Sequence, residues 1–148
     1  MRIGQQRRKT FGFCCRTNLG EADDADYGYK LYIVFGCTAD PSDKNHETEN
    51  DNPDAATMSW DISTIPVAIG TIGGVVMKDS AKIEVTCLNE WAKETATTNE
   101  AKLYANIKKL ECMLYGGTMT TGSDTTTVVP FLPTPAAIYS ILSDGLTT

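Results

Sequence analysis

The sequence has only one histidine, His46, among its 148 residues, and this limits the catalytic chemistry open to it. A Ser-His-Asp or Cys-His arrangement would have to use this residue as its base. His46 lies in a polar, acidic segment, and no serine of the chain sits in a glycine elbow. We therefore expect no catalytic residue and no enzymatic activity.

Glycine-based and cysteine-based binding motifs are also missing. The glycines at positions 70, 73 and 74 do not form G-x-G-x-x-G, and no Lys-Ser or Lys-Thr pair follows them at P-loop spacing. The five cysteines include no C-x-x-C pair, and their odd number does not favour a disulfide framework. We expect reduced, partly buried thiols and no cofactor.

The acidic part of the chain carries an incomplete metal-binding pattern. Oxygen-bearing side chains alternate along Asp43, Asn45, Glu47 and Glu49. An EF-hand requires glycine at its sixth position and glutamate at its twelfth, and this chain has threonine and aspartate there. No helical pattern flanks the segment, so we expect no metal site.

Long apolar runs and an excess of positive charge are absent as well. No window reaches the roughly 20 apolar residues that a membrane helix needs, and the uncharged stretch 62–77 is interrupted by proline and glycine. The formal net charge is -6 and the pI is about 4.7. The missing apolar run argues against a membrane partner. An acidic surface repels phosphate, which argues against a protein that grips DNA.

Patterns typical of β-strands occur in four segments, at residues 10–15, 29–38, 57–62 and 81–88. Segment 29–38 is apolar on both faces, so we expect both faces to be covered. In segment 57–62, the alternation predicts that Met58, Trp60 and Ile62 point inward.

One amphipathic helix is expected over residues 99–115. Thr97 and Glu100 fit a capping box at its start, and Gly116 supplies a stop at its end. Apolar residues at helical spacing predict the face that packs on the core, formed by Leu103, Ile107, Leu110 and Leu114.

The remaining segments are interpreted from their turn residues and polarity. We expect an acidic loop at 18–28, a long acidic loop at 40–54, a hairpin or extended arm at 67–77, a polar linker at 118–127, and a short terminal helix or strand at 136–142. Strands outnumber helices in this reading. The predicted fold is mainly β with one flanking α-helix, an antiparallel β-sandwich or barrel in a single domain, 1–148.

Several short motifs then follow one another in a fixed order. They are Arg16-Thr17-x-x-Gly20, Tyr27-Gly28-Tyr29-Lys30-Leu31, Asn50-Asp51-x-Pro53, Ser59-Trp60 with Thr64-x-Pro66-Val67, Ile107-Lys108-Lys109-Leu110-Glu111-x-x-Leu114-Tyr115-Gly116, and Leu132-Pro133-Thr134-Pro135. Between the second and third, Ala39, Pro41, Ser42 and Lys44 fit an Ala-x-Pro-Ser-x-Lys loop. In this order they resemble the major tail protein family of long-tailed bacteriophages, whose members build the tail tube.

The resemblance implies a tail-tube type of sandwich or barrel whose N-terminal family portion is lacking in this chain. It implies subunits that form rings, usually hexameric, which stack into a tube that conducts DNA without binding it specifically. The partners would be further copies of the chain and other tail proteins, in the virion tail and, during assembly, in the host cytoplasm. An acidic lumen would let DNA slide without sticking.

In such tubes long loops bridge subunits, so the resemblance makes segment 40–54 a contact loop. Its expected contact residues are Asp40, Asp43, Lys44, Glu47, Glu49 and Asp51. Two alternatives stay open: a related tube or virion component on the same scaffold, and a small metal- or carbohydrate-binding β module.

Overall fold

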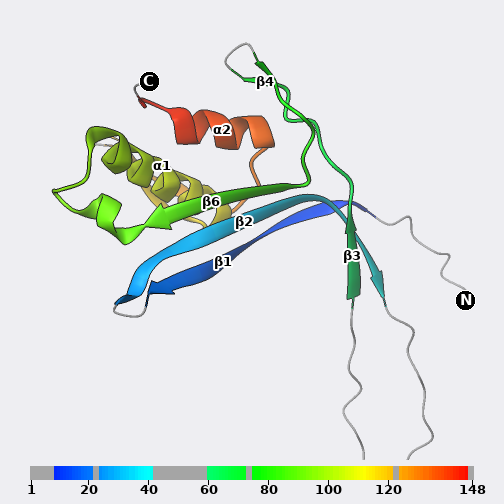
Figure 1. Ribbon diagram of the computed structural model, residues 1–148. Coiled ribbons are helices and arrows are strands. Elements are labelled where there is room, and N and C mark those ends of the chain that lie inside the picture. The colour runs from blue at the N-terminus through cyan, green and yellow to red at the C-terminus, as the bar shows by residue number, and fades with distance from the viewer. Residues whose placement is uncertain (1–8, 22–23, 42–59, 73–74, 122–123, 147–148) are drawn as a thin grey trace, which may run out of the picture.

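The computed structural model describes residues 9–21, 24–41, 60–72, 75–121 and 124–146. Strands and helices follow one another in the order shown in Figure 1. The elements are β1 (Phe11–Glu21), β2 (Asp24–Pro41), β3 (Trp60–Thr64), β4 (Thr71–Ile72), β5 (Val75–Val76), β6 (Lys82–Leu88), the 3-10 helix η1 (Asn89–Ala92), α1 (Thr98–Tyr115), β7 (Gly117–Thr121), β8 (Asp124–Val128) and α2 (Pro135–Ser143).

The central element is a four-stranded antiparallel sheet built around the long strand β2. Strand β1 pairs along one edge of β2, from Phe11 opposite Cys37 to Glu21 opposite Asp24. Strands β6 and β3 both pair with β2 as well, and they share its other edge. The hairpins β4–β5 and β7–β8 are separate two-stranded sheets.

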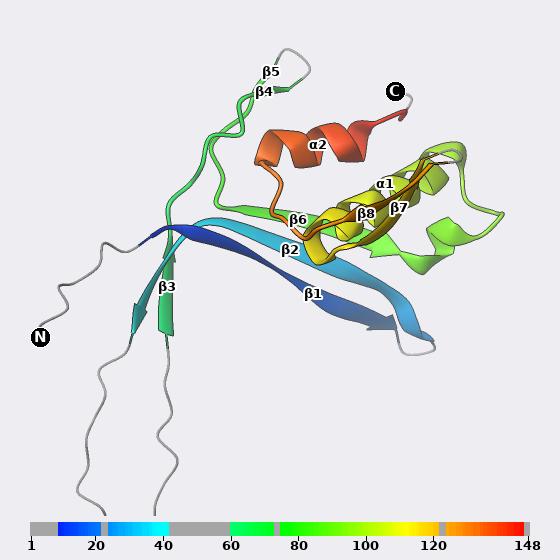
Figure 2. The ribbon, with the colours of Figure 1, turned by 180° about the vertical axis from the view of Figure 1, so that it is seen from behind.

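A bend in β2 at Gly36 divides the sheet into two parts. Gly36 has a φ of 63°, and a Cβ atom there would collide with the carbonyl oxygen of Ile65, so only glycine is accommodated. The register between β1 and β2 shifts at this point, between Phe11 and Phe13. Beyond the bend, the end of β2 and its partner β3 turn away from the side on which the helices lie (Figures 1 and 2).

Helix α1 begins as the sequence predicts. The Thr97 hydroxyl accepts from the Glu100 amide at 3.3 Å, and the Glu100 carboxylate accepts from the Thr97 amide at 2.7 Å. These bonds lower the pKa of Glu100. The helix ends at Gly116, which has a φ of 78°, so the predicted capping box and stop are both confirmed.

The core lies between one face of the sheet and the helices. Three predicted helix residues, Ile107, Leu110 and Leu114, are buried in it, whereas Leu103 is only partly buried at its margin. The sheet contributes alternate residues of β2 and β6, and α2 contributes one residue. The buried members are Tyr29, Leu31, Ile33, Phe35, Val85, Cys87, Ile107, Leu110, Leu114 and Ile138.

The structure corrects several boundaries. A second helix, α2, covers the segment left open as helix or strand, with the Thr134 hydroxyl accepting from the Ala137 amide at its start. Residues 118–127 are not a linker, since most of them form the β7–β8 hairpin, and 18–28 is not a loop, since β1 and β2 run through most of it. Threonine-rich and acidic stretches lack apolar alternation, so the sequence pattern does not reveal solvent-exposed strands in them.

The prediction that β3 points inward is wrong for the residues described. Trp60 is 54% exposed and Ile62 49% exposed, and Met58 lies outside the described residues. Strand β3 pairs with β2 beyond the Gly36 bend, where the helices do not reach. The expectation that both faces of β2 are covered also fails in part, because Tyr32 and Val34 are only half-buried.

The predicted class is confirmed at the level of a mainly β, antiparallel fold, although with two α-helices instead of one. Both helices lie on the same side of the four-stranded sheet (Figure 2). Within the described ranges none of the three sheets closes on itself. Neither described helix has the length and apolar character needed to cross a membrane.

Candidate functional site

The edges of the four-stranded sheet are open in the part of the chain that the structure describes. Strand β1, eleven residues long, pairs with β2 alone, and so do β6 and β3. Each edge strand therefore presents backbone N–H and C=O groups along its outer side. Such rows of groups can pair with a strand of another chain.

The face of the sheet opposite the helices carries a charged row in its middle. Lys30 and Lys82 approach the Glu84 carboxylate at 2.6 Å and 3.3 Å, and the Lys82 ammonium lies 4.5 Å from the centre of the Tyr32 ring. The hydrogen bonds from Lys30 and Lys82 lower the pKa of Glu84, and the bond to Glu84 raises the pKa of Lys30. These pairs are solvent-accessible and contribute little stability.

The same face becomes apolar at the Gly36 bend. The Phe11 and Phe13 rings lie 6.4 Å apart, and Phe13 is directly opposite Val34. Paired residues of an antiparallel ladder point to the same side, so Ile62 and Trp60, opposite Ala39 and Pro41, continue this surface along β3. We call it the aromatic patch and define it by Phe11, Phe13, Val34, Ile62 and Trp60.

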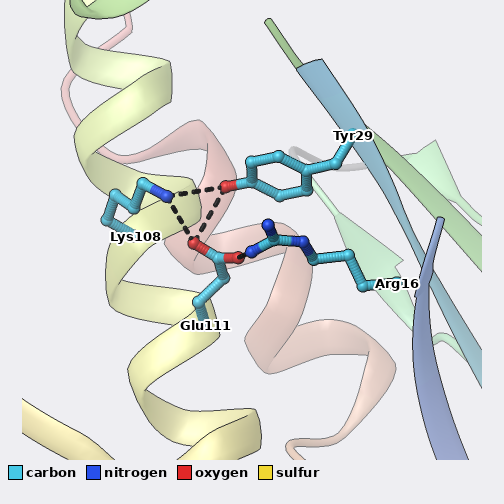
Figure 3. A network of polar contacts seen from close by, with 4 residues as sticks. All are labelled: Arg16, Tyr29, Lys108 and Glu111. Carbon is cyan, nitrogen blue, oxygen red and sulfur yellow. Dashed lines mark hydrogen bonds and ion pairs between the residues drawn. The ribbon is translucent and has the colours of Figure 1, made fainter. Parts of the chain in front are cut away.

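On the helix side, a polar network joins the sheet to α1 (Figure 3). The Tyr29 hydroxyl donates to Glu111 Oε2 at 2.8 Å, and Lys108 Nζ donates to the Tyr29 hydroxyl at 3.0 Å and to Glu111 Oε2 at 2.8 Å. Arg16 approaches Glu111 Oε1 at 3.5 Å, and its guanidinium carbon lies 4.3 Å from the Tyr29 ring centre. Glu111 therefore binds donors from β1, β2 and its own helix.

The environment of Tyr29 favours a structural role over an acid–base role. Tyr29 is 4% exposed, and burial together with hydrogen bonding to Cys87 and Glu111 raises its pKa well above the ordinary value of 10.0. The phenol therefore keeps its proton and acts as a hydrogen-bond donor. Burial lowers the pKa of Lys108, but the hydrogen bond to Glu111 together with the nearby Glu111, Tyr104 and Cys87 groups leaves that pKa raised.

A pH dependence follows from this raised pKa. The folded-state pKa of Tyr29 lies above the unfolded value of 10.0, so its contribution to stability is complete below pH 10.0 and is lost as pH rises further. We expect the unfolding free energy to fall by about 1.4 kcal/mol per pH unit from this residue above that pH. Denaturant titrations should show a correspondingly shallower fall for Tyr29→Phe. Tyr139→Phe, a change at an exposed residue, should keep the wild-type slope, and parallel slopes for all three proteins would contradict the assignment.

A groove of about 500 Å³ lies beside this network, between α1 and β7. Several of its polar groups are engaged within the chain: Cys112 Sγ lies 3.4 Å from the carbonyl oxygen of Thr118, and Lys108 and Lys109 pair with Glu111 and Asp144. The groove brings together no nucleophile, base and orienting group. Its chemistry is that of a surface recess between two packed elements.

Most of the predicted contact loop lies outside the described residues. Asp40 is half-buried near the end of β2, whereas Asp43, Lys44, Glu47, Glu49 and Asp51 lie outside the described residues. Among the described residues, no three His, Cys, Asp or Glu side chains gather in a way that could hold a metal ion. Of the predicted helix face, Ile107, Leu110 and Leu114 lie in the core and Leu103 lies at its margin.

Comparisons with known proteins give no further guide, because no model of a protein family, no curated protein and no solved structure matches this chain significantly. The functional reading therefore depends on the sheet edges, the aromatic patch and the sequence resemblance. The network and the patch were not predicted from sequence. Lys108 and Glu111 show the spacing of a helical ion pair, but their partners on β1 and β2 emerge only from the fold.

Proposed function

We propose that this chain is a structural subunit of a phage tail tube, without catalytic activity, that assembles with further copies of itself. The observation that carries the proposal is the open-edged sheet, with β1 on one side and β6 and β3 on the other. Because the two edges differ, pairing β1 of one copy with β6 of the next is a head-to-tail contact. Such contacts close into rings when the rotation between copies is suitable.

Edge pairing also accounts for how a tail-tube barrel would form. A sheet that is open in one subunit becomes continuous when neighbouring copies add their strands, and a closed ring of sheets leaves no unpaired edge. The sandwich or barrel expected from the sequence would then belong to the assembly. The helices on one side of each sheet would form a separate layer.

The acidic lumen expected from the resemblance needs further contributions in this arrangement. The described charged row on the uncovered face holds Lys30, Lys82 and Glu84, which is not an acidic set. Acidic side chains for a DNA channel would have to come from elsewhere in the chain, whose net charge is -6. The contact loop with Asp43, Glu47, Glu49 and Asp51 is the proposed source, and DNA would pass without specific binding.

Negative-stain electron microscopy of the concentrated protein tests the proposal directly. We expect rings or tubes, together with a sedimentation coefficient that rises with protein concentration. A chain that stays monomeric at high concentration and binds a metal ion or a carbohydrate tightly would contradict the proposal and support a small binding module. Rings built with other tail proteins but not by the chain alone would favour a related virion component.

A further inference from the structure

The hairpin β4–β5 forms an apolar arm that projects from the body of the molecule. It rises beyond α2, on the helix side of the sheet (Figures 1 and 2). The Met77 amide donates to the carbonyl oxygen of Gly70 at 3.0 Å, so the hairpin pairing continues beyond the ends of β4 and β5. Val76 is 80% exposed and Val75 63% exposed.

The arm has no charge with which to interact favourably with water or with an ionic partner. Between Asp61 and Lys78 the sequence has no charged residue, in a chain with 32 charged side chains of Lys, Arg, Asp and Glu (13 basic and 19 acidic). An exposed, uncharged apolar segment of this kind is typical of an interaction surface. Its partner must offer an apolar surface.

The aromatic patch is such a surface on the same chain, and it faces the other way. Phe11, Phe13, Ile62 and Trp60 belong to the face opposite the helices, at the bend where β3 turns away from them. The arm lies on the helix side, so it does not cover the patch of its own molecule. Within the described part of the chain, the arm therefore leaves the patch of its own molecule exposed.

We propose that the β4–β5 arm of one copy packs on the aromatic patch of a second copy. The inference rests on the self-association proposed above and specifies a contact distinct from edge pairing. The two surfaces match in chemistry, because the residues that define each of them are apolar. They lie on opposite sides of the sheet, so the contact is head-to-tail and can repeat from copy to copy. Trp60, with its large exposed area, is the anchor residue of the contact.

Trp60 also provides the readout. The chain has two tryptophans, so Trp91→Phe leaves Trp60 as the sole indole fluorophore. In this background we expect its emission to shift to shorter wavelength, with weaker quenching by acrylamide, as the protein assembles. Val76→Asp should move this change to a roughly 100-fold higher protein concentration, because a carboxylate would be buried without a partner. Val129→Asp is the matched control, since Val129 is 78% exposed but belongs to neither surface.

A mixing experiment tests the head-to-tail geometry. The Val76→Asp protein with Trp91→Phe retains its patch, and an excess of Trp60→Ala with Trp91→Phe supplies intact arms without fluorescence. The mixture should restore the blue shift. Circular dichroism spectra establish that each variant is folded, and Val75→Asp serves as a second arm variant.

Three results would overturn the inference. Assembly seen by sedimentation while Trp60 stays exposed to quencher would refute the contact and leave the tail-tube proposal standing. A blue shift that Val76→Asp and Val75→Asp leave intact would mean that another element, or another protein, covers the patch. Absence of any assembly in the wild type would remove the proposed function and the contact together.

Discussion

Proline at an outward-facing amide of β1 should abolish assembly while the subunit stays folded. In an extended strand the N–H groups of successive residues point to opposite edges, so one of the amides of Thr17 and Asn18 faces β2 and the other faces outward. Proline is tolerated in an edge strand where the missing N–H would face solvent. The pair Thr17→Pro and Asn18→Pro therefore separates the two sides of one strand.

The expected effects of the two variants differ in kind. The variant with proline at the amide that faces β2 loses a ladder hydrogen bond and places the proline ring against β2. This should destabilise the fold by about 3 kcal/mol or more, by analogy with proline in other regular elements. The outward variant should retain the wild-type circular dichroism spectrum and denaturation midpoint. It removes one donor and adds bulk at the edge where a second strand would pair, so rings and tubes should disappear from micrographs.

Sedimentation velocity gives the quantitative measure. The outward variant should remain monomeric at concentrations where the wild type assembles. If both variants fold and both assemble as the wild type does, the β1 edge is not the contact surface. In that case the arm and the aromatic patch are the remaining candidates for self-association, and they can be tested separately through Trp60.

The parts of the fold that local chemistry determines were predictable. The structure confirms the capping box formed by Thr97 and Glu100 and the glycine stop at Gly116. Each of these two features depends only on residues within about one helical turn at its own end of the helix. The core-facing residues of β2 before the bend were also predictable, because the alternate apolar residues Leu31, Ile33 and Phe35 are all buried in the core. In both cases the pattern and the burial concern a single element.

Features that depend on two distant elements were not predictable. Strand β3 has the alternation of a half-buried strand, yet Trp60 and Ile62 are exposed because Gly36 bends their partner strand away from the helices. The Glu111 network needs β1, β2 and α1 to be placed together. No single segment carries that information, so the sequence indicated a helix ion pair but not its role in fixing α1 to the sheet.

The candidate site shows the same division. From the sequence we predicted a site at the acidic residues of the contact loop, because a run of charged residues can be recognised without knowledge of the fold. The structure adds open strand edges and an apolar face, which are properties of pairing and register. An edge strand and a central strand can have the same residue pattern, and only the pairing of each strand with its neighbours distinguishes them.

Leu110→Ala should cost about 2 to 5 kcal/mol of the unfolding free energy, as truncations of fully buried leucines do. Leu110 has no exposed surface and lies at the centre of the face that α1 packs on the sheet. Its removal takes away apolar contacts and leaves a cavity between a helix and a sheet that are also held by the Glu111 network. Because that network resists collapse of the helix onto the sheet, we expect a value in the upper half of the range.

Leu103→Ala is the matched control for this prediction. It makes the same chemical change two helical turns earlier, at a residue that is only partly buried at the margin of the core. Its cost should be clearly smaller, because part of the side chain is already in contact with water and water can occupy the space left. Urea denaturation of the three proteins at a concentration below that of assembly measures both values. A loss under about 1 kcal/mol for Leu110→Ala, or equal losses for the two variants, would mean that α1 does not pack on the sheet through this face in the isolated subunit.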